Sequence, residues 1–97
     1  MAYVVKTVTT KPAGVQWFGQ ANPVANQRFI AWARAQAGVL TAIGRATDLN
    51  TFEATTVFAD KAAYDAFTAA AGANADAQAR QAYAQAQGFQ TTVTVMQ

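Results

Sequence analysis

The sequence predicts an α+β fold with the ferredoxin-like element order β-α-β-β-α-β, a four-stranded antiparallel sheet and a second helix that is broken in two. Three observations lead to this prediction. Runs of β-branched and aromatic residues mark four strands, helix-capping residues precede alanine-rich stretches, and a very short turn joins the two middle strands. Strands joined by such a turn are antiparallel. We expect residues 1–97 to form a single domain with its helices on one face of the sheet.

The chain begins with a strand and a short apolar patch. Residues 3–10 (YVVKTVTT) are β-branched and aromatic, which is typical of a strand. The strand ends at residues 11–14 (KPAG), because proline and glycine interrupt regular structure. Residues 15–19 (VQWFG) follow as an apolar patch, which we interpret as a loop or a single turn.

The first helix is predicted from its ends and its apolar stripe. Asn22 and Pro23 are typical of the N-cap and the first helical position. Gly38 supplies the left-handed conformation that commonly follows a helix, so the helix is expected to end near Ala37. The apolar residues at helical spacing are Phe29, Trp32, Ala33 and Ala37.

The second half of the chain repeats the pattern in the order strand, strand, helix, strand. Residues 39–47 and 51–58 are expected to be strands, separated by the turn Asp48-Leu49-Asn50. Asp60 caps a helix over residues 61–71, residues 72–74 interrupt it, residues 75–87 resume it, and residues 89–96 form the last strand. The apolar stripe of the helix over 61–71 consists of Ala63, Tyr64, Phe67 and Ala71.

The composition excludes several function classes. The chain has no histidine, cysteine or serine, so the usual nucleophiles, the side chain that titrates near neutrality and the soft metal ligands are absent. We therefore expect no metal and no cofactor. Seven Lys and Arg residues oppose five Asp and Glu residues and are scattered along the chain, which argues against nucleic-acid binding. No stretch resembles a signal peptide or a membrane span, which predicts a cytoplasmic or virion-associated protein.

One segment carries a resemblance to a known family. TTVFADKAAYDAF (55–67) is similar to the third strand and second helix of the dimeric α+β barrel proteins of the antibiotic-biosynthesis-monooxygenase-like group. The length and element order of the whole chain also fit that group. The resemblance implies a ferredoxin-like fold and a homodimer. Members that act on substrates use His, Asn, Trp or Tyr inside the barrel, and this chain offers no His, so no catalytic residue is assigned.

The candidate ligand-pocket or interface residues are mostly aromatic. Trp17 and Phe18 are expected to lie between glycines outside regular structure, where they either form a lid or partner anchor or plug one end of the core. Trp32 belongs to the stripe of the first helix and Tyr64 to that of the second. Both are interpreted as core residues or as the wall of a ligand pocket between helices and sheet.

A charged pair completes the candidates. Glu53 is the only glutamate and lies within a predicted strand, where a buried carboxylate would have a raised pKa and suit a general base. Arg45 lies on the preceding strand and is expected to face Glu53 across the hairpin. The alternative is an ordinary cross-strand ion pair on a solvated surface.

Two functional hypotheses follow from these observations. The first is a non-catalytic structural or interaction protein, encoded by a phage or virus. The alternative is a small-molecule-binding protein or cofactor-independent oxygenase with a small apolar ligand near Trp32 and Tyr64. Both include a homodimer formed through the sheet face opposite the helices, because the strands carry apolar residues on both faces and helices cover only one.

Overall fold

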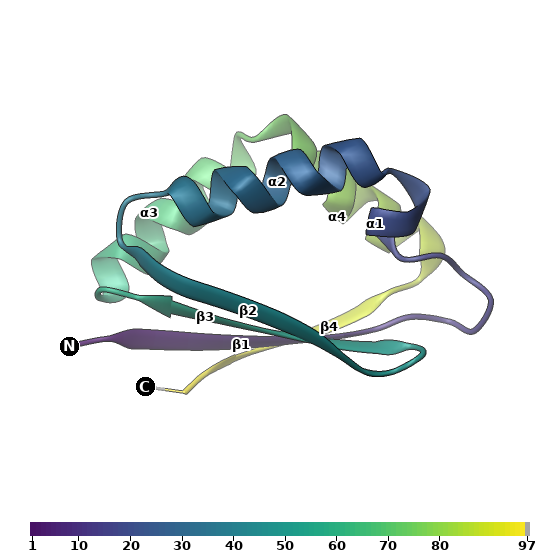
Figure 1. Ribbon diagram of the computed structural model, residues 1–97, viewed down its shortest axis with the longest axis horizontal. Helices are drawn as coiled ribbons and strands as arrows, with labels where there is room; N and C mark the ends of the chain where they lie inside the picture. The colour runs from purple at the N-terminus through teal and green to yellow at the C-terminus, as the bar shows by residue number, and fades with distance from the viewer. Residues whose placement is uncertain (97) are drawn as a thin grey trace.

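The computed structural model describes residues 1–96 and shows two layers, an antiparallel sheet and a layer of helices on one of its faces (Figure 1). The strands lie in the order β2-β3-β1-β4, and each neighbouring pair is antiparallel. The predicted α+β ferredoxin-like fold, with its broken second helix, is confirmed. The elements are β1 (Tyr3–Thr10), α1 (Phe18–Ala21), α2 (Pro23–Ala35), β2 (Val39–Asp48), β3 (Thr51–Phe58), α3 (Lys61–Gly72), α4 (Ala75–Gln87) and β4 (Gln90–Val95).

Side-chain caps fix where the three longer helices begin. Asn22, Asp60 and Asn74 each accept a hydrogen bond from the backbone N–H three residues further on, at 3.2, 2.8 and 2.9 Å. Each bond satisfies an N–H group of the first turn that has no partner within the helix. Gly88 ends α4 with a φ of 79°, a conformation that favours glycine.

Several boundaries differ by one or two residues from the expected ones, since β2 extends to Asp48, α3 extends to Gly72 and β4 ends at Val95. α2 ends at Ala35, because Gln36 turns to an extended conformation and its side-chain Nε2 donates to the Trp32 carbonyl at 3.0 Å. β4 begins at Gln90, because the N–H of Phe89 donates to the Ala84 carbonyl at 2.9 Å and closes the end of α4. These local hydrogen bonds, which the residue pattern alone does not show, set the helix ends.

Alternation along the strands gives the sheet two different faces. Tyr3 and Val5 of β1 lie on the inner face, toward the helices, and Val5 is almost fully buried there. Val4 and Lys6 lie on the outer face, which no helix covers (Figure 1). The sheet therefore presents one packed face and one bare face within a single chain.

The core between the layers is thin. Among the residues described, the fully buried hydrophobic ones are Val5, Ala25 and Phe58. The larger aromatic side chains are half-buried and pack against one another. Phe58 contacts Tyr64 and Phe67 of α3, with ring centroids 5.3 and 5.4 Å apart. Ring-to-ring contact therefore supplies much of the packing between helices and sheet.

We predict that Phe67→Ala lowers the free energy of unfolding by about 3 kcal/mol, at the lower end of the range for removing a buried phenylalanine. Phe67 is half-buried between Phe58 of the sheet and Trp32 of α2, so its removal leaves both rings with a gap. Chemical denaturation measures the change. Thr68→Ala, on the exposed side of the same helix, is the control and should shift the midpoint little. An unchanged midpoint for Phe67→Ala would show that the ring contributes no packing.

Candidate functional site

A continuous row of rings lies between the helix layer and the inner face of the sheet. We call it the inner aromatic row. Its members, in order of contact, are Tyr3, Tyr64, Phe58, Phe67, Trp32 and Phe29. Successive ring centroids are 5.2, 5.3, 5.4, 5.5 and 5.8 Å apart. Only Phe58 is fully buried, and the other five rings remain half-buried. The row joins Trp32 and Tyr64, two of the predicted site residues, through Phe67 and Phe58.

Arg80 of α4 stands at the end of this row. Its guanidinium carbon lies 4.2 Å from the ring centroid of Phe29, a cation–π contact. Its Nε is buried and has no hydrogen-bond partner among the residues described. Burial lowers the pKa of Arg80 below its ordinary value. A partly desolvated cation thus faces an aromatic ring, and no ion pair within residues 1–96 involves it.

Sequence analysis missed Arg80, although a signal was present. The sequence predicts an alanine- and glutamine-rich helix over residues 75–87, and no site residue was assigned to that helix. The half-buried residues of α4 recur at helical spacing, and Arg80 falls on that stripe, three residues before Tyr83. Arg28 of α2 binds the adjacent Asp76 through two hydrogen bonds of 3.1 and 2.9 Å. That pairing occupies the carboxylate nearest to Arg80 along the helix.

Trp17 and Phe18 lie at the other end of the molecule, in a second aromatic cluster. Trp17 packs against Phe52 and Phe89, with centroids 6.1 and 5.6 Å apart, and Phe18 packs against Tyr83 at 5.7 Å. The Tyr83 hydroxyl donates to the Gln16 carbonyl at 2.6 Å, which ties the loop to α4. Both aromatic residues are half-buried, and their ring contacts favour the interpretation in which they close one end of the core.

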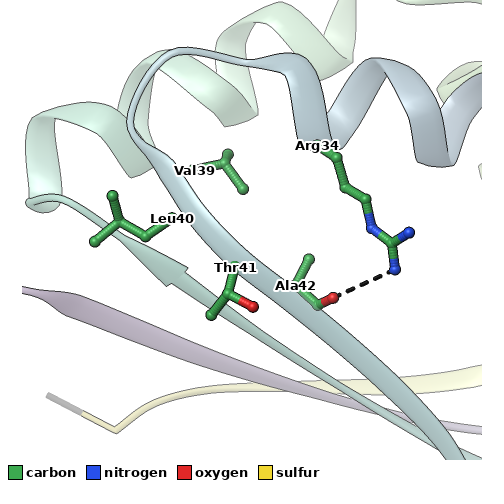
Figure 2. A pocket seen from close by; sticks show the side chains of 5 residues that line it. All are labelled: Arg34, Val39, Leu40, Thr41 and Ala42. Carbon is green, nitrogen blue, oxygen red and sulfur yellow. Dashed lines mark hydrogen bonds between the residues drawn. The ribbon is translucent and has the colours of Figure 1, made fainter.

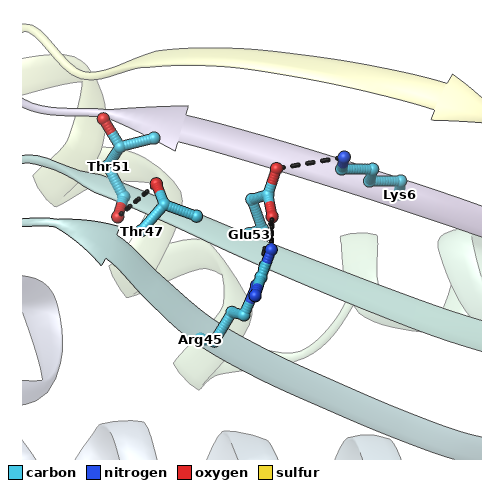
Figure 3. Close-up of polar contacts among 5 residues, drawn as sticks. All are labelled: Lys6, Arg45, Thr47, Thr51 and Glu53. Carbon is cyan, nitrogen blue, oxygen red and sulfur yellow. Dashed lines mark hydrogen bonds and ion pairs between the residues drawn. The ribbon is translucent and has the colours of Figure 1, made fainter.

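Glu53 and Arg45 lie on the outer face, away from the aromatic row. The Glu53 carboxylate accepts from Lys6 Nζ at 3.0 Å and from Arg45 Nη2 at 3.3 Å, one cation on each side (Figure 3). The hydrogen bond from Lys6, followed by the attraction of both cations, lowers the pKa of Glu53 despite opposing desolvation. An ionised carboxylate with both oxygens engaged is a weak general base, so the geometry favours the ion-pair interpretation.

Two surface hollows accompany these groups. A hollow of about 530 Å³ opens on the outer face over the Glu53 network, where Val4, Thr55 and Met96 complete its walls. A smaller one of about 310 Å³ lies beside the edge strand β2, where Arg34 reaches across and donates to the Ala42 carbonyl at 3.4 Å (Figure 2). Neither hollow is lined by the inner aromatic row, so the predicted site residues fall into three separate places.

Within residues 1–96, no group of three or more Asp, Glu, His or Cys side chains is arranged to hold a metal ion. None of the helices in the same range is long and apolar enough to cross a membrane.

Comparison with known proteins finds the same fold with little sequence identity. No protein-family model matches the chain, and no curated protein matches it. Rv0793 from Mycobacterium tuberculosis matches with a TM-score of 0.74 and 13% identity, over 100% of this chain and 94% of that one. A variant of SnoaB, a cofactor-independent oxygenase from Streptomyces nogalater, matches with a TM-score of 0.66 and 13% identity, over 98% and 91% of the two chains.

A candidate antibiotic biosynthesis monooxygenase from Deinococcus radiodurans gives a TM-score of 0.70 at 11% identity, over 98% of this chain and 90% of that one. The fold resemblance to this group is thereby confirmed. We expected a non-catalytic structural or interaction protein encoded by a phage or virus, and this expectation is wrong. The structures that match nearly the whole chain include one described as an oxygenase and two described as antibiotic biosynthesis monooxygenases. They favour the small-molecule-binding alternative.

We predict that Glu53→Gln reduces the loss of stability in acid. The folded-state pKa of Glu53 is lowered, so its contribution is fully present above the unfolded pKa and disappears as pH falls through the folded value. Denaturation midpoints measured between about pH 5 and pH 3 should fall less steeply in the variant. Asp76, whose pKa its bond to Arg28 also lowers, accounts for part of the remaining slope. Identical pH profiles for the two proteins would contradict the network.

Proposed function

We propose that this chain binds a small aromatic molecule between its helices and sheet and acts as a cofactor-independent oxygenase. The observation that carries the proposal is the inner aromatic row, in which rings from four elements contact one another while all but Phe58 stay partly accessible. Half-buried rings that meet at tilted and edge-on angles offer faces and edges on which a planar ligand packs. Trp32 and Tyr64 are the wall residues of this site.

The composition supports a reaction in which the substrate supplies the electrons. In such a monooxygenation one atom of O2 enters the product, the other leaves as water, and the substrate provides the reducing equivalents. Only an electron-rich substrate reacts in this way, and the protein's tasks are to hold it, orient it and exclude water. An apolar aromatic site without nucleophilic thiol, serine or imidazole groups suits these tasks.

We predict that 2-naphthol, a neutral bicyclic probe at pH 7, shifts the indole N–H resonance of Trp32 and leaves that of Trp17 in place. Trp32 belongs to the inner aromatic row, whereas Trp17 belongs to the cluster at the other end. Two-dimensional NMR of the labelled protein reads both signals, and the matched variants Trp32→Phe and Trp17→Phe assign them. A shift confined to Trp17, or no shift of either signal, would contradict the site.

We predict that the protein accelerates the uptake of oxygen by an electron-rich aromatic substrate. Oxygen uptake is followed with electron-rich hydroxynaphthalenes in buffer that contains a chelator, against the rate without protein. Trp17→Phe should retain the protein-dependent rate and Trp32→Ala should lose most of it. If oxygen uptake with the parent protein equals the uptake without protein, the oxygenase activity is refuted and only the binding of an aromatic molecule remains.

The proposal includes a homodimer formed through the outer face. That face carries Val4, Val8, Val57 and two strongly exposed side chains, Ile43 and Met96, with relative exposures of 65% and 56%. Burying such a surface is favourable, and two-fold pairing of identical surfaces is the commonest way to do it. The outer hollow over Glu53 would then be enclosed between two protomers.

We predict that sedimentation equilibrium at micromolar concentration gives twice the chain mass of 10.2 kDa. Ile43→Glu should give the single-chain mass, because it places a charge among the apolar side chains of the outer face. Leu49→Glu is the matched control, since Leu49 is 88% exposed in the turn beyond β2 and should leave the dimer intact. A parent protein that sediments as a monomer would refute the pairing.

A further inference from the structure

We propose that Arg80 makes the aromatic site selective for an acidic ligand, namely a planar aromatic molecule that carries an ionised carboxylate. This inference rests on the proposed function, because it names the class of molecule that the inner aromatic row receives. It depends on a separate observation, the buried Nε of Arg80 that has no hydrogen-bond partner among the residues described.

Among the residues described, every Asp and Glu side chain already has a partner other than Arg80. Asp76 binds Arg28, and Asp65 binds Lys61 at 2.9 Å. Glu53 lies on the outer face between two cations. Asp60 caps α3, and Asp48 accepts from the backbone N–H of Asn50 at 2.8 Å. These are the five Asp and Glu residues of the sequence, so none of their side chains is the partner of Arg80 in the part of the chain that the structure describes.

The position of Arg80 suits a ligand carboxylate. Its guanidinium stacks on Phe29, which connects through Trp32 to the rest of the row. A flat aromatic ligand that packs along these rings would direct a substituent at the end of the row toward the guanidinium. Arginine offers several N–H donors in one plane, which match the two oxygens of a carboxylate. Hydrogen bonding to a carboxylate would also relieve the buried Nε, which is otherwise unsatisfied at a free-energy cost.

A purely structural role accounts less well for this residue. A methionine would supply apolar packing at this position without a charge, whereas the guanidinium adds a desolvation cost that no ion pair within residues 1–96 offsets. A group of this kind in a native protein calls for an explanation, and a charged ligand provides one. The structural alternative predicts that the charge itself is dispensable for binding.

The test compares 2-naphthoate with its neutral isostere 2-naphthamide by titration calorimetry at pH 7. The parent protein should bind the naphthoate at least about tenfold more tightly, the range expected for a charge-assisted hydrogen bond. In NMR spectra, the Nε–H signal of Arg80 should shift with naphthoate and not with naphthamide. Arg80→Gln should bind both probes equally, and Arg80→Lys should keep only part of the preference. Arg34→Gln, which removes an exposed arginine outside the row, should behave like the parent.

The outcomes separate this inference from the proposed function. Equal affinity of the parent protein for both probes would overturn the inference and leave an aromatic site for neutral ligands. A preference for naphthoate that survives in Arg80→Gln would also overturn it. If neither probe binds and 2-naphthol does not shift the Trp32 signal, both proposals fail. The comparison within the parent protein needs no substitution, so it decides the question even if the Arg80→Gln variant does not fold.

Discussion

The abundance of alanine is the constraint on which the rest of this structure depends. Alanine favours helices, but its methyl group cannot fill the space between a helix layer and a sheet. The few large side chains must therefore carry the packing, and they do so as rings that touch one another. Because the rings are few, only Val5, Ala25 and Phe58 become fully buried among the hydrophobic residues described. The accessible aromatic row is a direct consequence of this composition.

The fold could be predicted because its signals are local. Capping residues such as Asp60, the glycines after the helices and the β-branched runs each act within a few residues of their own position. The same holds for Arg45 and Glu53, since the turn at residues 48–50 sets the register that brings them face to face. Lys6 could not be inferred in this way, because it reaches Glu53 from β1, which pairs with β3 only through the long-range topology.

The candidate site was harder to predict, because its residues had to be sorted between two faces. Period-two alternation shows that Glu53 and Phe52 point to opposite sides, but it does not show which side the helices cover. The structure resolves this, with Phe52 against Trp17 on the inner side and Glu53 among cations on the outer side. Helical periodicity predicts that Trp32 and Tyr64 lie on the apolar stripes of their helices. It does not predict that Arg80 is half-buried, because charges on an alanine- and glutamine-rich helix are usually solvated. The environment of Arg80 depends on Phe29, which is distant in the sequence.

The thin core also gives a thermodynamic reason for partners. A chain of this size buries a modest fraction of its surface. Its half-buried rings and its bare sheet face leave apolar surface in water, and burying that surface would be favourable. Any molecule that binds only the folded state stabilises it by mass action, whether it is a ligand on the inner side or a second protomer on the outer side. These two contributions use opposite faces of one sheet, which β1 and β3 share at its centre. The inner face is lined by aromatic rings, and the row ends at Arg80, whose Nε has no hydrogen-bond partner among the residues described. The outer face holds the Glu53 carboxylate, which two cations already share. The proposed ligand recognition and the proposed self-association therefore use opposite faces of the sheet, the inner and the outer one.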